Sequence, residues 1–327
     1  MKTFYDSDAS LDILKNQLIA IIGYGIQGRA QALNLRDSGM DVIIGNIKDK
    51  YNEQASKDGF KIMNISEACS KASVIMVLIP DQAHREIYDK YIYPNLNTDN
   101  LLVFAHGYSI HFKDIKPPDF IDVCLLAPRM PGKPIREYFL NGGGVPAFID
   151  VFQDSSGEAW GKVLSLAKGI GATRSCAMHV TFQEETEIDL FIEQFLLPLI
   201  IRGISLSFNE LTKRGFSPEA VLMELYSSGE IGELLLMASK SNIFKIWEEN
   251  ASPTCQYGIF RNSEKIMPKN KTSELIERVL NELRDGSFIN DLNDEAKIGY
   301  KNLNNYNSNN KKSLLVSTSE NLNRILK

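Results

Sequence analysis

Short apolar runs alternate with amphipathic segments over the first 180 residues, which is the pattern of a parallel sheet with crossover helices. From Thr181 onward this pattern stops and long, apolar-rich helical segments follow. We therefore predict an α/β, Rossmann-like dinucleotide-binding domain over residues 1–180 and an all-α domain over residues 181–327. The runs that predict buried strands are residues 18–22, 41–45, 73–79, 101–104 and 122–126.

Proline positions divide the helical half. One helix is predicted from about Thr181 through Phe208 with a kink at Pro198, because proline removes a helical hydrogen bond. Another helix is predicted to begin at Pro218, since proline suits the first helical turn. We expect residues 250–258 to form a coil, and the Asn- and Lys-rich end of the chain from residue 302 to fray or dock a short helix.

A glycine-rich turn, GYGIQG, follows the first predicted strand and leads into a helical segment. In that setting G-x-G-x-x-G is a dinucleotide-binding fingerprint. Gly23 permits the tight turn, Gly25 lets a pyrophosphate approach the backbone, and Gly28 lets the helix pack closely on the strand. The N-terminus of the helix adds N–H donors for the phosphates.

The residues after the second predicted strand bear on the choice of cofactor. NAD-binding proteins usually place a carboxylate there, whereas here Lys48 and Lys50 flank Asp49. Two cations favour the 2′-phosphate of NADP. The alternative, a solvated loop without cofactor contact, stays open.

Ligands of open α/β sheets bind beyond the carboxyl ends of the strands. His106 follows such a strand directly and is therefore a better candidate for chemistry than His84 or His179. A structural role for this imidazole stays open, since histidine commonly satisfies backbone groups.

Acidic residues crowd the helix that begins near Thr181. Those of its first turns, among them Glu185, are explained by capping and by the helix dipole. Asp189 and Glu193 lie beyond that range, four residues apart on one face of an otherwise apolar helix that we expect to be buried. Two buried carboxylates need a cation, and Mg²⁺ suits oxygen ligands.

The alternative for this acidic pair is a surface or salt-bridge role. On the later helix, Glu224 and Glu230 also lie among apolar residues and could complete an oxygen-rich cage. By spacing alone they are ordinary surface acids.

Composition narrows the classes of function. The net charge of −5, without a basic stripe, argues against a nucleic-acid partner. The N-terminal segment lacks an apolar signal core, and we expect no membrane-spanning segment. Four scattered cysteines without Cys-x-x-Cys spacing indicate reduced thiols in a cytoplasmic protein.

Seven stretches, in order along the chain, resemble the short form of ketol-acid reductoisomerase, also called acetohydroxyacid isomeroreductase. The FAHG and EETE-x-DLF-x-EQ elements are the most specific, and the likeness extends to about residue 260. The stretches are IGYGIQGRAQALNLRDSG, VLIPDQ, FAHGYSIHF, APRMPG, GVPAFIDVFQDSSG, TFQEETEIDLFIEQ and SPTCQYG.

The resemblance implies roles for particular residues. His106 would be catalytic, Asp189 would bridge two Mg²⁺ ions, Glu193 would bind one of them, and Ser252 would bind substrate. Glu224 would be a metal ligand supplied by the partner subunit, which implies a homodimer or higher homo-oligomer with shared active sites. The cofactor would contact Tyr24, Gly25, Ile26, Gln27, Asp81, Gln82, Ala83, His84 and Gly132.

The implied reaction is an Mg²⁺-dependent alkyl shift in 2-acetolactate or 2-aceto-2-hydroxybutyrate, followed by hydride transfer from NADPH. The product is a 2,3-dihydroxy acid of branched-chain amino-acid biosynthesis. Paired cations suit this chemistry, because a hydroxyl must be deprotonated while carbonyl oxygens are polarised.

Two departures from the family pattern stand out. Arg129 replaces the usual lysine, and its planar fork is no simple substitute for a point charge. Ser228 lies four residues after Glu224, where the family has a second glutamate, so Glu230 is the better candidate for the last ligand and for a catalytic proton shuttle.

Two other functions are compatible with parts of the sequence. One is a metal-free β-hydroxyacid-type dehydrogenase, which would need a catalytic lysine where this chain has acids. The other is a non-catalytic NADP-binding regulator descended from the enzyme. The Asp189/Glu193 pair argues against a regulator, because buried acids without a cation would be costly.

Overall fold

The computed structural model describes residues 1–326 and divides the chain into two compact units, Met1–Ile188 and Asp189–Lys327. The division lies inside helix α8 (Phe182–Phe191), later than the predicted boundary between residues 180 and 181. The first turns of α8 pack on the sheet, where Phe182 joins a core cluster and Glu185 and Thr186 are buried. That packing assigns them to the first unit.

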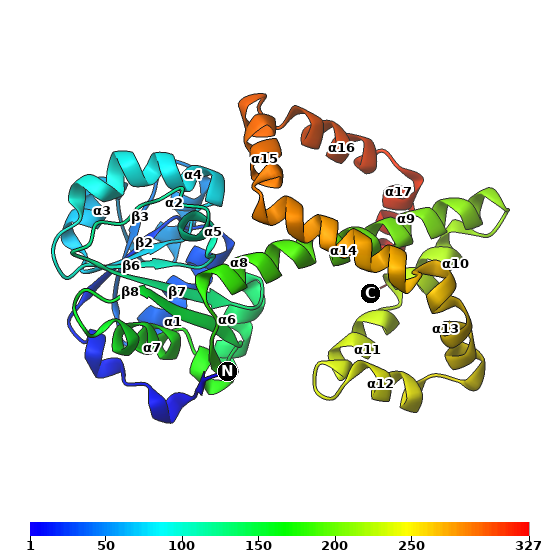
Figure 1. Cartoon of the computed structure of the whole chain (residues 1–327), viewed down its shortest axis with the longest axis horizontal. Coiled ribbons are helices and arrows are strands. Elements are labelled where there is room, and N and C mark those ends of the chain that lie inside the picture. The colour runs from blue at the N-terminus through cyan, green and yellow to red at the C-terminus, as the bar shows by residue number, and fades with distance from the viewer. Residues whose placement is uncertain (327) are drawn as a thin grey trace. The chain divides into compact units, whose positions relative to one another are not determined.

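The first unit is built on one nine-stranded sheet, drawn in Figure 1, with strand order β1-β9-β8-β7-β6-β5-β2-β3-β4. Strands β2 to β7 pair in parallel, as the alternating pattern predicts, whereas β8 runs antiparallel to β7. The strands are β1 (Thr3–Phe4), β2 (Leu18–Ile22), β3 (Asp41–Gly45), β4 (Lys61–Met63), β5 (Val74–Val77), β6 (Leu101–Phe104), β7 (Asp122–Pro128), β8 (Ala147–Gln153) and β9 (Ala177–His179).

Helices cover both faces of this sheet (Figure 1). Helices α1 and α7 pack on one face and α3 on the other, which is the doubly wound arrangement that the sequence predicts. The helices of this unit are α1 (Ile26–Asp37), α2 (Lys50–Lys57), α3 (Ile65–Lys71), α4 (Asp81–Ile87), α5 (Tyr108–His111), α6 (Gly132–Leu140) and α7 (Ala159–Gly169), with short 3-10 or π turns at Asp6–Asp8, Leu11–Leu14, Tyr88–Ile92, Tyr93–Asn95 and Ala172–Arg174.

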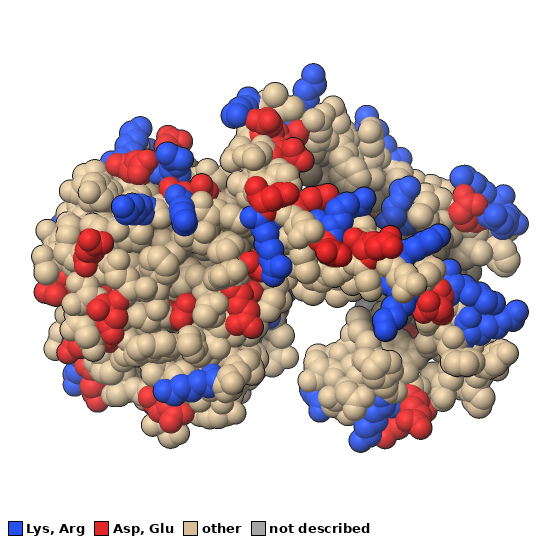
Figure 2. All heavy atoms as spheres, viewed as in Figure 1, with Lys and Arg blue, Asp and Glu red and all other residues tan. Residues whose placement is uncertain are grey.

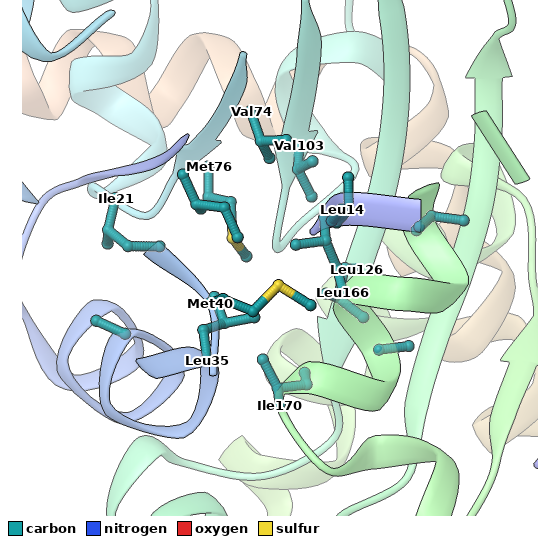
Figure 3. Packing of buried hydrophobic residues seen from close by; sticks show 14 of the residues in the cluster. Leu14, Ile21, Leu35, Met40, Val74, Met76, Val103, Leu126, Leu166 and Ile170 are labelled. Atoms are coloured by element: carbon teal, nitrogen blue, oxygen red, sulfur yellow. The ribbon is translucent and has the colours of Figure 1, made fainter. Parts of the chain in front are cut away.

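The core forms because successive residues of a strand point to opposite faces. Along β2, Ile19 and Ile21 join the cluster under α1 and α7, whereas Ala20 and Ile22 join the cluster under α3. Figure 3 shows side chains of the first cluster, from strands and helices, converging on one another. The continuous apolar run of β2 is therefore the sequence of a strand buried on both sides.

The second unit is helical throughout its described residues, as predicted. Its helices are α9 (Leu197–Lys213), α10 (Pro218–Leu222), α11 (Glu230–Ala238), α12 (Ile243–Asn250), α13 (Pro253–Ile266), α14 (Lys269–Arg284), α15 (Ser287–Lys297), α16 (Lys301–Lys311) and α17 (Leu314–Ile325), with π-helical turns at Ile192–Leu196 and Met223–Ser227. Pro218 occupies the first turn of α10, and Leu322 of α17 packs against Phe208 and Leu222, so the predicted docking of a last helix is confirmed.

Two local predictions differ from the structure. At the predicted kink the structure has a π-helical turn over Ile192–Leu196, directly before helix α9, which has Pro198 in its first turn. The coil predicted over residues 250–258 is wrong, because Pro253 opens helix α13. Proline interrupts a helix interior but favours its first turn, and Ser252 directly before it supplies the cap.

One continuous helical run, Phe182–Lys213, is long and apolar enough to cross a membrane by length and composition alone. The prediction that no segment would have this property is therefore wrong, because the π turn carries the helix past Pro198. Only 6% of its most apolar window is buried within the chain. The prediction of a buried helix thus holds only for its first turns.

Candidate active site

The predicted glycine fingerprint forms the turn between β2 and α1. A Cβ on Gly28 would lie 2.1 Å from the carbonyl oxygen of Gly23, so the close packing of helix on strand requires glycine there. A Cβ on Gly25, by contrast, would meet nothing within 4 Å. The backbone at Gly25 therefore faces open space, as a pyrophosphate would need.

A cavity of about 580 Å³ lies over this turn. Residues of the fingerprint line it together with four cationic side chains, which fits a dinucleotide with its phosphates. The predicted residues Tyr24, Gly25, Ile26, Lys50 and Gly132 line it; the further cations are Arg29, Lys133 and Arg136. Gln27 instead donates a hydrogen bond to the carbonyl of Met130, which ties the turn to the end of β7.

The two predicted cofactor lysines differ in their positions. Lys50 opens α2 and lines the cavity, whereas Lys48 is exposed and lies outside the lining residues. Asp49 caps α2 by accepting the N–H of Tyr51, and its carboxylate also accepts from Asn46. The carboxylate of Asp49 is thus already engaged in holding its own loop.

The sheet order β7-β6-β5-β2 aligns the ends of four parallel strands beside the glycine turn. Asp81 follows β5, His106 follows β6 and Arg129 follows β7, so these residues come from neighbouring strand ends. Asp81 and His106 are in contact, with 3.0 Å between a carboxylate oxygen and Nδ1.

Asp81 orients the imidazole of His106. Burial raises the pKa of Asp81, but the hydrogen bond from His106 and the neighbouring imidazoles outweigh it, so its pKa lies below the usual value. An ionised carboxylate only accepts, so His106 donates its Nδ1–H to Asp81. Asp81, predicted as a cofactor contact, therefore acts on the candidate catalytic histidine.

The other predicted residues of α4 have separate positions. His84 is buried, with Nδ1 2.7 Å from the Ser109 hydroxyl and Nε2 3.0 Å from the Ile79 carbonyl. Burial lowers the pKa of His84, so its ring is neutral. The ring thereby connects α4 to Ser109 of α5 and to Ile79, which follows β5. Gln82 is exposed and Ala83 half-buried on the first turn of α4, where their cofactor contact stays a prediction.

Helix α8 approaches the end of β6 closely at Gly107. A Cβ at this position would lie 2.5 Å from the Phe182 carbonyl oxygen and 2.5 Å from the Thr186 hydroxyl. The Phe182 N–H donates to Asp150 and the Glu184 N–H to the hydroxyl of Thr181, which fixes where α8 begins. The glycine after His106 thus lets an acidic helix lie against the strand end that carries His106.

Glu185 is the main residue that sequence reasoning missed. Its side chain is 1% exposed, accepts the N–H of Gly107 at 2.8 Å and pairs with Arg129 at 3.0 Å. Its place in the first turns suggested capping alone. The available signal was spacing, because Glu185, Asp189 and Glu193 follow one another at intervals of four residues on one helix face.

Three side chains come together as a possible metal site. Ligand atoms of His106, Glu185 and Asp189 all lie within 4.8 Å of one another. Asp189 lies one turn beyond Glu185 on α8, so the helix itself sets their spacing. Two carboxylates and an imidazole are a donor set that fits a divalent cation, and the oxygen atoms suit Mg²⁺.

The other predicted ligands are not part of this cluster in residues 1–326. Glu193 is exposed in the π turn, Glu224 is exposed in the next π turn, and Glu230 is exposed at the start of α11. Ser252, predicted to bind substrate, caps α13 by accepting the N–H of Cys255 at 3.3 Å. All four lie in the second unit, and their roles stay predictions.

Family models match almost the whole chain. Residues 13–176 match the acetohydroxy acid isomeroreductase NADPH-binding domain, and residues 182–327 match the ketol-acid reductoisomerase C-terminal domain. The chain belongs to the ketol-acid reductoisomerase family. It is an NAD(P)-dependent enzyme of branched-chain amino-acid biosynthesis that combines an isomerase with an oxidoreductase step.

Solved structures agree with this assignment. An NADH-preferring ketol-acid reductoisomerase from an uncultured archaeon has a TM-score of 0.94 and 32% identity, over 100% of this chain and 99% of that one. A semialdehyde dehydrogenase NAD-binding protein from Cupriavidus necator has a TM-score of 0.59 and 17% identity over 81% of this chain and 99% of that one. Plasmodium falciparum pyrroline carboxylate reductase has a TM-score of 0.52 and 15% identity over 81% and 99% of the two chains. The last two share the fold alone.

Proposed function

We propose that this ketol-acid reductoisomerase converts 2-acetolactate and 2-aceto-2-hydroxybutyrate to 2,3-dihydroxy acids with two Mg²⁺ ions and NADPH. The observation that carries the proposal is the cluster of His106, Glu185 and Asp189. It lies on the strand-end edge that also bears the cavity of the glycine turn.

The cofactors and the protein divide the chemistry between them. Bound Mg²⁺ supplies polarisation of the substrate's hydroxyl and carbonyl oxygens, and bound NADPH supplies the hydride. Asp189 and Glu193 are the proposed metal ligands on α8, with Glu185 beside them. Arg129 presents its guanidinium to the substrate's oxygen atoms, and Glu185 keeps that guanidinium in place.

Proton transfer falls to His106 and Glu230. Asp81 accepts the Nδ1–H of His106 and so orients the imidazole for proton exchange. We assign Glu230 to the proton shuttle and, with Glu224, to the metal ligands. Both glutamates are exposed in the single chain, which suits ligands that a second copy supplies.

We also propose that two or more copies assemble around shared sites in the cytoplasm. Large apolar side chains are exposed along α9, among them Ile200 and Ile201, and exposed apolar surface of this kind marks interfaces. The four cysteines are free in the structure, which suits a reducing compartment.

The choice of nicotinamide cofactor rests on the cavity. Lys50 lines it, and Asp49 is engaged as a helix cap, which favours the 2′-phosphate of NADPH. One relative at 32% identity is NADH-preferring, so both cofactors belong in the test.

A steady-state assay with 2-acetolactate tests the proposal, comparing the wild-type enzyme with Asp189→Asn across Mg²⁺ concentrations and with NADPH and NADH in parallel. We expect wild-type turnover to require Mg²⁺ and to be more efficient with NADPH. Asp189→Asn removes a charged ligand and should lower kcat at least about a hundredfold. Glu184→Gln, an exposed acid on the same helix, is the matched control and should stay near wild type.

Three outcomes contradict parts of the proposal. Turnover that survives extensive chelation would show that the reaction needs no metal ion. Full activity of Asp189→Asn would show that Asp189 is not an essential metal ligand. Cofactor binding without turnover favours a non-catalytic regulator.

A further inference from the structure

Arg129 lies against an aromatic ring. Its guanidinium carbon is 4.8 Å from the centroid of the Phe148 ring. The sheet produces this contact, because β7 and β8 are antiparallel and pair Ala127 with Phe148 and Pro128 with Ala147. Arg129 follows directly after the last paired residue of β7.

Arg129 is held from three directions. Its backbone N–H donates to the Pro146 carbonyl at 2.8 Å, and Nη1 donates to Glu185 at 3.0 Å. The Phe148 ring supplies the third contact. The ring itself packs against the core cluster on that face of the sheet, so it is a fixed surface.

These contacts suit arginine in particular. A guanidinium is planar and stacks on an aromatic face, whereas an ammonium is a strongly hydrated point charge on a flexible stem. Glu185 accepts from Nη1 at one end of the fork, and rotation about the side-chain torsions changes the plane of the guanidinium. A ring face beside it restricts that rotation, because the cation is attracted to the π system.

We propose that Phe148 is a positioning residue for Arg129, and that the pair is what allows arginine to serve at this position. The ring sets the plane of the guanidinium, so that the fork meets the oxygen atoms of the acetohydroxy acid in one orientation. This inference rests on the proposed function, in which Arg129 contacts substrate.

A double-mutant cycle tests the proposal, using Phe148→Leu, Arg129→Lys and the double variant in the full-length enzyme with 2-acetolactate, Mg²⁺ and NADPH. We expect Phe148→Leu to lower kcat/KM about five- to thirtyfold, mainly through kcat. In the Arg129→Lys background the same change should cost less than about threefold, because the stacking partner is gone. Phe148→Tyr keeps the ring and should retain activity within about threefold of wild type.

Fluorinated phenylalanines at position 148 separate the ring's charge distribution from its packing. Mono-, di- and trifluorophenylalanine keep nearly the same shape while weakening the negative face of the ring. We expect kcat/KM to fall stepwise along this series, with thermal unfolding unchanged. A purely structural role for Phe148 would give no such series.

The possible outcomes are distinguishable. Equal losses from Phe148→Leu in both backgrounds, or a flat fluorination series, overturn the positioning role while the proposed reaction stands. A wild-type enzyme without turnover contradicts the proposed function instead. If Phe148→Leu unfolds, the fluorinated series decides the matter alone.

Discussion

At the scale of single residues, the candidate site depends on buried charges with fixed partners. Glu185 would be costly to bury alone, since an uncompensated buried carboxylate costs several kcal/mol. The N–H of Gly107 and the guanidinium of Arg129 offset that cost. The same contacts hold α8 against the ends of β6 and β7, so the pairing serves both stability and geometry.

Lys48 lies in the loop before α2 and Lys50 is the first residue of that helix, and of the two only Lys50 lines the cavity over the glycine turn. We predict that Lys50→Ala raises the KM for NADPH about tenfold, because a charge-assisted contact to the 2′-phosphate is lost. The KM for NADH should stay within about twofold, since NADH lacks that phosphate. Steady-state kinetics with both cofactors measure this difference.

Lys48→Ala is the matched control and should leave both KM values near wild type. An equal rise for the two cofactors would place Lys50 on a part of the dinucleotide that they share. No change for either would remove Lys50 from the site.

At the scale of elements, α8 connects the sheet to the proposed metal. Its start is fixed by Asp150 and Thr181, and its close approach at Gly107 brings Glu185 and Asp189 beside His106. Spacing of four residues puts the acids on one face. That face can lie against the strand ends because Gly107 has no side chain that would keep α8 away.

Gly107→Ala tests this contact. The new Cβ would lie 2.5 Å from the backbone oxygen of Phe182, so α8 must move or the local backbone must distort. We predict a loss of about 1–3 kcal/mol in the free energy of unfolding. A fall of at least about a hundredfold in kcat should accompany it, because a displacement near 1 Å suffices for that. Chemical denaturation and steady-state assays measure the two effects.

Gly143→Ala is the control, because a Cβ there would make only ordinary contacts, the nearest at 3.5 Å. It should change both quantities little. A Gly107→Ala enzyme with wild-type kcat would show that the position of α8 does not govern the chemistry.

At the scale of the complete chain, the two units differ in how much core each builds. The first buries two large clusters, one on each face of its sheet. The second contributes a small cluster around Phe208 and Leu222 and exposes many large apolar side chains. On the face shown in Figure 2, charged residues of both signs are interspersed among wide areas of uncharged residues. The exposed apolar side chains of the second unit are of the kind that mark interfaces.

We predict that Ile201→Asp weakens the proposed assembly. Ile201 is 58% exposed on α9, and a charge placed in an apolar interface would have to be desolvated. Sedimentation velocity should show a wild-type oligomer and a variant that dissociates at micromolar concentration, with loss of activity if the sites are shared.

Leu140→Asp is the matched control, since Leu140 is 63% exposed but lies on α6 of the first unit. It should not change the sedimentation coefficient. A fully active wild-type monomer would contradict the shared sites.

Elements with a local signal are predictable from the amino-acid sequence alone. They include the apolar run of β2, the glycine turn after it and the proline that opens α10, because strand burial, turn geometry and proline's fixed torsion act within a few residues. The motifs that resemble the family likewise single out His106, Arg129 and Asp189 by their positions in the chain.

Contacts between distant chain segments became apparent only in the folded chain. Glu185 looked like a capping residue until the close approach at Gly107 placed it beside Arg129. The contact of Asp81 with His106 likewise appears only where neighbouring strand ends meet, and its cofactor contact stays a prediction. Ser252 and Pro253 resembled coil because the same residues both interrupt helices and begin them. The cases of Glu185 and Asp81 have one cause. Which partner satisfies a buried charge or a free backbone group is settled by packing in three dimensions, which local patterns do not encode.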